Sequence, residues 1–180
     1  GKPFWAFALS TALDPAYLVP TLAQLRMEVF SDLAYGASVI QYFTYWTPVS
    51  SEGLFHDAPI AVDGTRTPTY EFVREMNSEL QSYAAVFSGS RVVSVGHTGA
   101  SLPNGTKAFE PFAPVRNVTT GAKGAVVSRI ENRGTTYLVV VNHDYTYAMT
   151  LSIGFEKGAK IERVGKNGGM LRIGAETVTG

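Results

Sequence analysis

The chain has 180 residues, no cysteine, and 15 Lys and Arg against 15 Asp and Glu, so its formal net charge is zero. A chain without a basic excess has no electrostatic footprint for nucleic acid or for an anionic membrane. The absence of cysteine excludes disulfides, zinc thiolates and thiol nucleophiles. No apolar run of about 18 residues predicts a membrane-inserted helix, and no motif indicates a metal or another cofactor. The aromatic share of 12% suits either sugar contact or a β-rich core.

The first half of the chain reads as a strand–helix–strand unit. The run "PFWAFAL" (residues 3–9) has the length of a strand, and "DPAYLVPT" (14–21) is a loop whose prolines exclude a helix before Pro20. Helical spacing of apolar residues then predicts a helix that ends at Gly36: Leu22, Leu25, Val29, Phe30 and Leu33. The apolar run "SVIQYFTYW" (38–46) follows as a second strand. Such a unit predicts a parallel strand pair.

A long loop and a second helix complete this half. The loop, residues 47–66, contains "SSEGLFHDAPIAVDGTR" and is long enough to indicate a functional segment. Thr67 is the predicted N-cap before Pro68 at the first helical position. Apolar residues at helical spacing extend the predicted helix to about residues 87–89.

After Gly89 the pattern changes to short strands separated by Gly, Asn or Asp. Strands are predicted in "RVVSVGHTG", "AVVSRIEN", "TTYLVVVNH", "AMTLSIGF", "KIERVGK" and "GMLRIG", with a turn-rich connector over residues 100–124. Hairpin turns are predicted at residues 132–134 and 166–169. This pattern is typical of an antiparallel β-sandwich. The predicted domains are therefore an α/β domain over residues 1–89 and an all-β domain over residues 90–180.

An isolated strand–helix–strand–helix segment cannot close an α/β sheet, because both sheet edges stay exposed. The edges therefore predict a partner: either a further segment of a longer protein or another copy of the chain.

The segment "LRMEVFSDLAYGASVIQYFTYWTPVSSEGLFHDAPIAVDG" resembles the last βαβα units of the (β/α)8 (TIM) barrel in β-galactosidase-like enzymes of glycoside hydrolase family 42. The "LAYGA" helix end, the aromatic strand with its tryptophan, and the Glu and Phe-His of the next loop carry the resemblance. The chain is particularly similar to bacterial glycosyl hydrolases of the Bacteroidetes type, in which a β-sandwich closes the chain. The resemblance implies a C-terminal part of a periplasmic or cell-surface hydrolase of β-linked, galactoside-like carbohydrate.

A retaining glycosidase needs two carboxyl groups across the scissile bond. The resemblance places the acid/base upstream of this chain and the nucleophile after the strand "PFWAFALST", where residues 8–11 carry no carboxylate. Asp14 is the nearest candidate for a displaced nucleophile. We therefore expect the chain alone to be inactive, although its parent is a hydrolase.

The remaining candidates form a sugar-contacting wall: Tyr45, Trp46, Glu52, Phe55 and His56. Trp46 at the strand end either stacks on a pyranose face or plugs the barrel top. His56 either binds sugar hydroxyls, as the resemblance implies, or anchors its loop by a hydrogen bond. Glu52 either binds sugar or is a solvated loop charge.

Two adjacent pairs, His56-Asp57 and His143-Asp144, are interpreted as chance neighbours, since adjacent side chains on a strand point apart and no third ligand accompanies them. Two other classes stay open besides a hydrolase fragment: a non-catalytic carbohydrate-binding protein whose barrel has lost its nucleophile, and a structural or interaction module.

Overall fold

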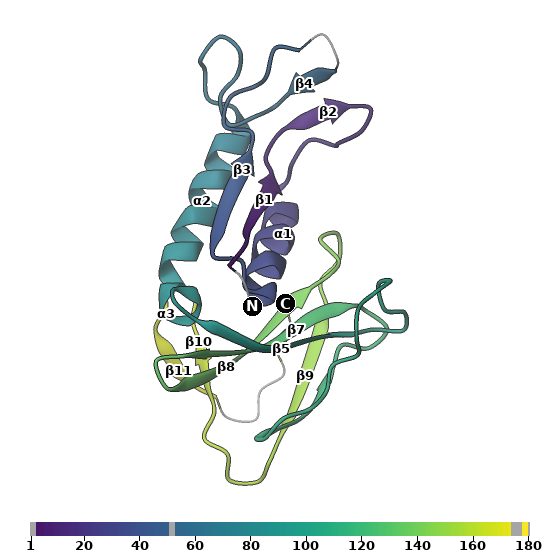
Figure 1. Ribbon diagram of the computed structural model, residues 1–180, viewed down its shortest axis with the longest axis vertical. Helices are drawn as coiled ribbons and strands as arrows, with labels where there is room; N and C mark the ends of the chain where they lie inside the picture. Colours follow the sequence, from purple (N-terminus) through teal and green to yellow (C-terminus); the bar gives the residue numbers. More distant parts are fainter. Residues whose placement is uncertain (1–2, 51–52, 174–177, 180) are drawn as a thin grey trace. The chain divides into compact units, whose positions relative to one another are not determined.

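The computed structural model describes residues 3–50, 53–173 and 178–179. The chain divides into two compact units, Gly1–Leu33 with Ala37–Gln81, and Ala34–Gly36 with Ser82–Gly180. Both combine helix and strand with several separate sheets, so the protein belongs to the mixed α and β class (Figure 1). Within the described residues, no helix is long and apolar enough to cross a membrane.

The first unit contains the predicted parallel strand pair. Strand β1 (Trp5–Leu9) runs parallel to β3 (Val39–Phe43), with Trp5 opposite Val39 and Leu9 opposite Phe43. Helix α1 (Leu22–Tyr35) connects the two strands, and Gly36 ends it at a φ of 95° that a side chain would disfavour. The sequence pattern therefore predicted this unit correctly, although β3 ends at Phe43, before the predicted Trp46.

The second helix is shorter than its apolar pattern predicted. Helix α2 spans Pro68–Ser82, and a separate short helix, α3 (Ala84–Phe87), follows it. Pro68 opens α2 as predicted, but the Thr67 hydroxyl donates to the Ala58 carbonyl at 2.6 Å and so ties down the preceding loop.

Both helices pack on the same face of the β1–β3 pair (Figure 1). The buried cluster joins one strand residue to four helix residues: Ala8, Leu25, Val29, Val73 and Met76. Ile40 and Tyr42 of β3 pack against this cluster. Because strand side chains alternate, the even-numbered residues of β1 and β3 face the helices and the odd-numbered ones face away.

Two short strands occur where the sequence predicted only loops. Strand β2 (Ala12–Asp14) and strand β4 (Leu54–His56) form an antiparallel ribbon. Ala12 lies opposite His56, and Asp14 lies opposite Leu54. Three residues are too few for a visible alternation, which is why the pattern did not reveal them.

In the second unit, β5 (Arg91–Thr98), β7 (Ala125–Asn132) and β8 (Thr135–Asn142) form an antiparallel sheet in the order β5-β7-β8. Arg133 and Gly134 connect β7 and β8 with φ values of 49° and 81°, as a two-residue hairpin turn requires. This hairpin confirms the predicted turn.

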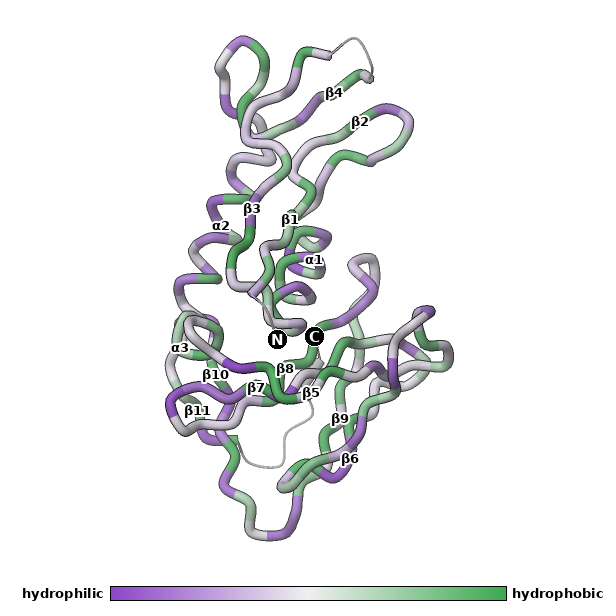
Figure 2. Tube along the Cα trace, in the orientation of Figure 1, coloured by the Kyte–Doolittle hydropathy of each residue, from purple (hydrophilic) through white to green (hydrophobic). Residues whose placement is uncertain are grey.

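The other strands of this unit form smaller sheets. Strand β9 (Thr150–Phe155) lies between β6 (Val115–Thr119) and β12 (Val178–Thr179), and β10 (Glu162–Val164) pairs with β11 (Met170–Arg172). Strand β6 falls in the predicted connector, whereas the β10–β11 hairpin confirms the predicted turn at residues 166–169. Figure 2 shows hydrophobic residues along β9, and a common core joins residues of β7, β8 and β9 to Val118 of β6.

Candidate functional site

The candidate site is built at the ends of β1 and β3, where the chain leaves both parallel strands. Ser10 and Thr11 follow β1 and are fully buried. The Ser10 hydroxyl donates to the Thr44 carbonyl at 2.9 Å, and the Thr11 hydroxyl donates to the His56 carbonyl at 3.1 Å. Two small polar residues thereby link the end of β1 to the end of β3 and to β4, a role that requires no carboxylate at residues 8–11.

Tyr45 and Trp46 lie on the segment that follows β3. Ile60 holds this segment, because its N–H donates to the Tyr45 carbonyl at 2.9 Å and its carbonyl accepts from the Thr47 N–H at 2.8 Å. The rings themselves stay accessible, with Tyr45 60% and Trp46 52% exposed. The backbone is therefore fixed by neighbours while two aromatic side chains face solvent, which is the arrangement that a stacking surface needs.

Phe55 belongs to the β2–β4 ribbon and lies opposite Leu13. Its ring meets the Phe43 ring edge to face, with 6.3 Å between centroids. This contact lets Phe55 join the ribbon to the end of β3. The contact with Phe43 therefore covers part of the Phe55 ring, which the sequence analysis predicted to contact sugar.

His56 lies between two carboxylates. Its Nδ1 is 2.7 Å from Oδ2 of Asp57, and its Nε2 is 3.5 Å from Oδ1 of Asp14, an ion-pair distance. The hydrogen bond with Asp57, together with the nearby Asp14 charge, raises the pKa of His56 above its usual value. The arrangement favours the protonated form of His56, which both carboxylates attract.

The side chains of His56 and Asp57 therefore do not point apart, contrary to the expectation for adjacent strand residues. The interpretation that they form no metal or catalytic pair stays a prediction. Asp57 has a φ of 54°, in the left-handed region that Asp tolerates better than most residues. This turn of the backbone ends the strand alternation and brings the Asp57 carboxylate back onto the His56 ring. Asp14 supplies the third group that the sequence pattern did not reveal, because 42 residues separate it from His56.

The geometry limits what His56 can present to a ligand. Asp57 occupies Nδ1, and Nε2 has no solvent exposure and no hydrogen-bond partner among the described residues. The accessible polar atoms of this cluster are carboxylate oxygens, since Asp14 is 63% exposed. The site therefore offers hydrogen-bond acceptors beside two aromatic rings.

The other predicted candidates lie elsewhere. Glu52 is outside the described residues. His143 and Asp144 do not pair, since Asp144 Oδ2 accepts from Lys123 Nζ at 2.7 Å. Among the described residues, no group of three or more His, Asp or Glu side chains is arranged to hold a metal ion.

No protein-family model, curated protein or solved structure matches this chain. The functional argument therefore rests on the residues and their geometry.

Proposed function

We propose that this chain is the C-terminal portion of a bacterial glycoside hydrolase that acts on β-linked, galactoside-like carbohydrate at the cell surface or in the periplasm. Its first unit contributes the last βαβα units of a (β/α)8 barrel, and its second unit is a β-sandwich. The parallel β1–β3 pair with two helices on one face supports the first assignment, and the core that joins β7 and β8 to β6 and β9 supports the second.

The observation that carries the proposal is the exposure of Tyr45 and Trp46 just after β3. Ligands of (β/α) barrels bind at the C-terminal ends of the strands, and an exposed aromatic ring suits the C–H-rich face of a pyranose. Tyr45, Trp46 and Phe55 would form the apolar wall, and Asp14 would accept hydrogen bonds from sugar hydroxyls. His56 orients the two carboxylates, and Glu52 remains a proposed polar contact.

Asp14 and Asp57, the two carboxylates of the candidate site, are not a pair suited to glycoside cleavage. Such a pair must leave space for the glycosidic oxygen between its members, but the His56 ring fills the space between Asp14 and Asp57. The catalytic carboxylates would therefore come from the remaining barrel strands, and the chain alone would not hydrolyse a glycoside.

Tryptophan fluorescence tests the proposed wall, because the chain has two tryptophans. Trp5→Phe leaves Trp46 as the reporter, and galactose should then shift the emission saturably. Trp46→Phe leaves Trp5 as the matched reporter and should abolish the response. A saturable response that persists in Trp46→Phe, or that is missing from both variants and the wild type, would overturn the proposal.

A second candidate function is a non-catalytic carbohydrate-binding protein. It is favoured by the residues after β1, where Ser10 and Thr11 make structural hydrogen bonds in place of a nucleophile. For a protein that carries this chain together with its remaining barrel strands, it predicts sugar binding without turnover of aryl β-galactosides. Hydrolysis that survives Asp14→Asn would reject it in favour of an enzyme with upstream carboxylates.

A further inference from the structure

The two-stranded sheet of the first unit leaves a free edge on each side. Among the described residues, β1 pairs only with β3. The Ser10 N–H donates to the Phe43 carbonyl, so alternation along β1 directs the N–H groups of Trp5, Phe7 and Leu9 away from β3. A side chain of α1 accepts the Leu9 N–H, but the outward backbone groups of Trp5 and Phe7 form a template for another strand.

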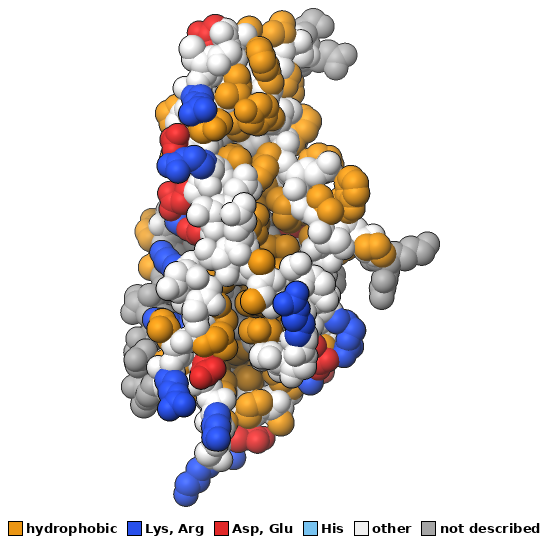
Figure 3. Space-filling view, turned by 90° about the vertical axis from the view of Figure 1, so that its left-hand side faces the viewer, with side chains coloured by type: hydrophobic (Ala, Val, Ile, Leu, Met, Phe, Trp, Pro, Cys, Tyr) orange, Lys and Arg blue, Asp and Glu red, His pale blue; other side chains and the backbone are white. Residues whose placement is uncertain are grey.

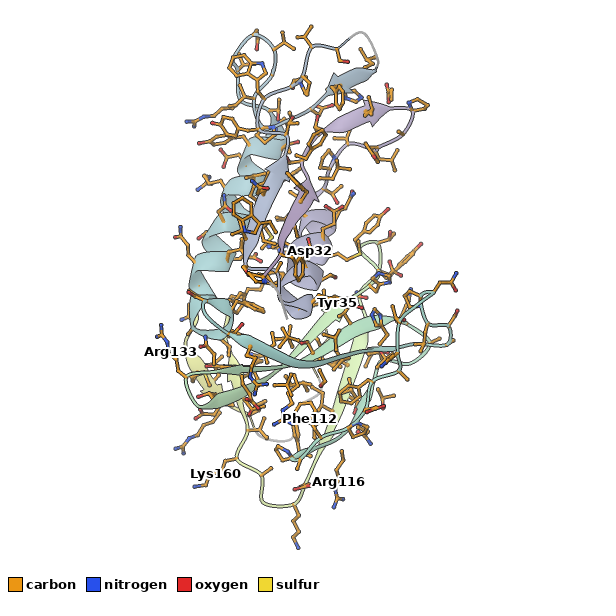
Figure 4. All side chains as sticks on the ribbon, viewed as in Figure 1. Asp32, Tyr35, Phe112, Arg116, Arg133 and Lys160 are labelled. Carbon is orange, nitrogen blue, oxygen red and sulfur yellow. The ribbon has the colours of Figure 1, made fainter. Side chains whose placement is uncertain are left out.

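Two carboxylates lie beside the free edge of β1. Glu28 Oε2 accepts the Leu9 N–H at 2.8 Å, which places this side chain at the outward edge of β1. Asp32 follows one helical turn later on the same face of α1 (Figure 4). It is half-buried, and no Lys or Arg among the described residues lies within ion-pair distance of it. This edge therefore carries negative charge that lacks a cation.

Beyond β3, the side of the sheet opposite to the β1 edge carries a basic residue. A groove of about 410 Å³ lies between the Tyr45 segment and α2, and its lining is mainly aromatic and polar: Tyr45, Pro59, Tyr70, Val73, Arg74, Asn77, Ser78 and Gln81. Arg74 is the only charged residue in this lining. It is exposed and binds Glu71 of its own helix, a surface ion pair that is weak enough to exchange partners. Figure 3 shows basic and acidic side chains along this side of the molecule, with hydrophobic ones gathered above.

The sheet face opposite the helices is also uncovered. Trp5 and Phe7 are each 64% exposed and Phe43 is 41% exposed. All three are odd-numbered residues on the face that neither helix covers. An added strand pair would extend this apolar face and allow it to close on itself.

We propose that the first unit associates head to tail with further copies of this chain, the β1 edge of one copy pairing in parallel with the β3 edge of the next. Arg74 of one copy then faces Asp32 and Glu28 of its neighbour, so the two edges are complementary in backbone pairing and in charge. With two strands per copy, about four copies would supply the eight strands of a closed (β/α)8 barrel. The inference concerns this chain on its own and does not depend on sugar binding, since in the proposed parent protein the remaining barrel strands would occupy the same edges.

Size-exclusion chromatography with light scattering tests the association directly. The wild-type chain, 19.4 kDa as a monomer, should show a mass that rises with concentration. Asp32→Lys and Arg74→Glu each place like charges on the two edges, and each should raise the concentration needed for association by about tenfold or more. Lys157→Glu is the control, since Lys157 is an exposed residue of the second unit.

A mixture of the two charge-reversed variants tests the head-to-tail geometry more directly. An equimolar mixture of Asp32→Lys and Arg74→Glu contains two complementary pairs of edges, because each edge of one variant meets the opposite charge on the other variant. The mixture should therefore regain the wild-type masses by alternating the two variants, although each variant alone associates weakly. The double variant has both charges exchanged and should regain the wild-type masses. Circular dichroism checks that each variant is folded, and Asp32→Asn with Arg74→Gln supplies a milder pair of substitutions.

A wild-type chain that stays monomeric at every concentration would overturn the proposal and would assign the two edges to other βα units. Association that is unchanged by both single charge reversals would also overturn it. A mixture that associates no better than the single variants alone would contradict head-to-tail pairing.

Discussion

At the scale of single residues, Asp32 is the ionisable group that burial perturbs most clearly. Loss of solvation on burial, with the nearby charge of Glu28, raises the pKa of Asp32 to about 6. A raised carboxyl pKa means that the folded state binds a proton more tightly than the unfolded state. Below about pH 4, which is the pKa of Asp in the unfolded chain, Asp32 is protonated in both states and does not destabilise the fold. As the pH rises from about 4 to 6, ionisation of Asp32 lowers the stability of the fold, and the loss persists at higher pH.

Asp32→Asn should accordingly stabilise the first unit at pH 7.5 and have little effect at pH 4. About half of the side chain is solvated, so we expect a gain of about 1 kcal/mol after allowance for screening. Urea unfolding of dilute protein at both pH values measures the difference. Asp63→Asn should have the opposite sign at neutral pH, because hydrogen bonds from Thr65 lower the pKa of Asp63. An equal gain from Asp32→Asn at both pH values would contradict the assignment.

The residue scale also shows what the sequence could not reveal. Exposed Tyr45 and Trp46 were predictable, because a proline two residues after the tryptophan marks the end of the strand region. The Asp14–His56–Asp57 cluster was not, because it depends on a positive φ at Asp57 and on a ribbon between distant loops. Glu28 was equally hidden, since an acidic residue within a helix gives no sign that it accepts a strand N–H.

At the scale of elements, the β2–β4 ribbon is held by charges as well as by its backbone. Thr11 anchors its base through the His56 carbonyl, and His56 bridges Asp14 and Asp57 at its end. The pKa of His56 is higher in the folded chain than in the unfolded chain, where it is about 6.5. The contribution of His56 to the stability of the ribbon is therefore fully present below about pH 6.5 and disappears as the pH rises through the pKa of the folded state. The ribbon should therefore loosen once the pH passes the raised pKa of His56.

A nuclear magnetic resonance titration of the imidazole protons tests this prediction. His56 should titrate above the free-imidazole value, whereas burial and the neighbouring His143 lower the pKa of His97 below it. Asp57→Asn removes the hydrogen-bonding anion and should shift the His56 midpoint downward while leaving His97 unchanged. A His56 midpoint at or below 6.5 in the wild type would contradict the carboxylate contacts.

Helices and strands with many regularly spaced apolar residues were predictable, and short strands were not. The spacing of Leu25 and Val29 predicted α1, and Gly36 predicted its end, because a helix needs several turns of consistent pattern. The spacing that continued through Tyr83 and Ala84 also predicted one long helix where α2 and α3 are separate. Periodicity reports which face is buried, but it does not report a change in the direction of the chain between two helices.

At the scale of the whole molecule, each unit contains a buried cluster of its own. Met76 is fully buried in the cluster under β1 and β3, and Ile130 is fully buried on β7 of the second unit. The second unit also contains its own polar link, since the Asn132 amide donates to the carbonyls of Ala85 and Ser88. Each unit thus has the apolar burial and the satisfied polar groups that a cooperative unit requires.

Met76→Ala and Ile130→Ala should each cost about 2–5 kcal/mol, but in different parts of the chain. Because Met76 belongs to the buried cluster of the first unit, Met76→Ala should speed amide hydrogen exchange in α1, β3 and α2 and leave β7 and β8 protected. Ile130→Ala should do the reverse, and Val49→Ala, at a solvent-exposed position, should change neither pattern. Hydrogen exchange read by mass spectrometry, on dilute protein, resolves the two regions. Equal loss of protection in both units from either substitution would show that the chain unfolds as one cooperative body, which two independent cores do not allow.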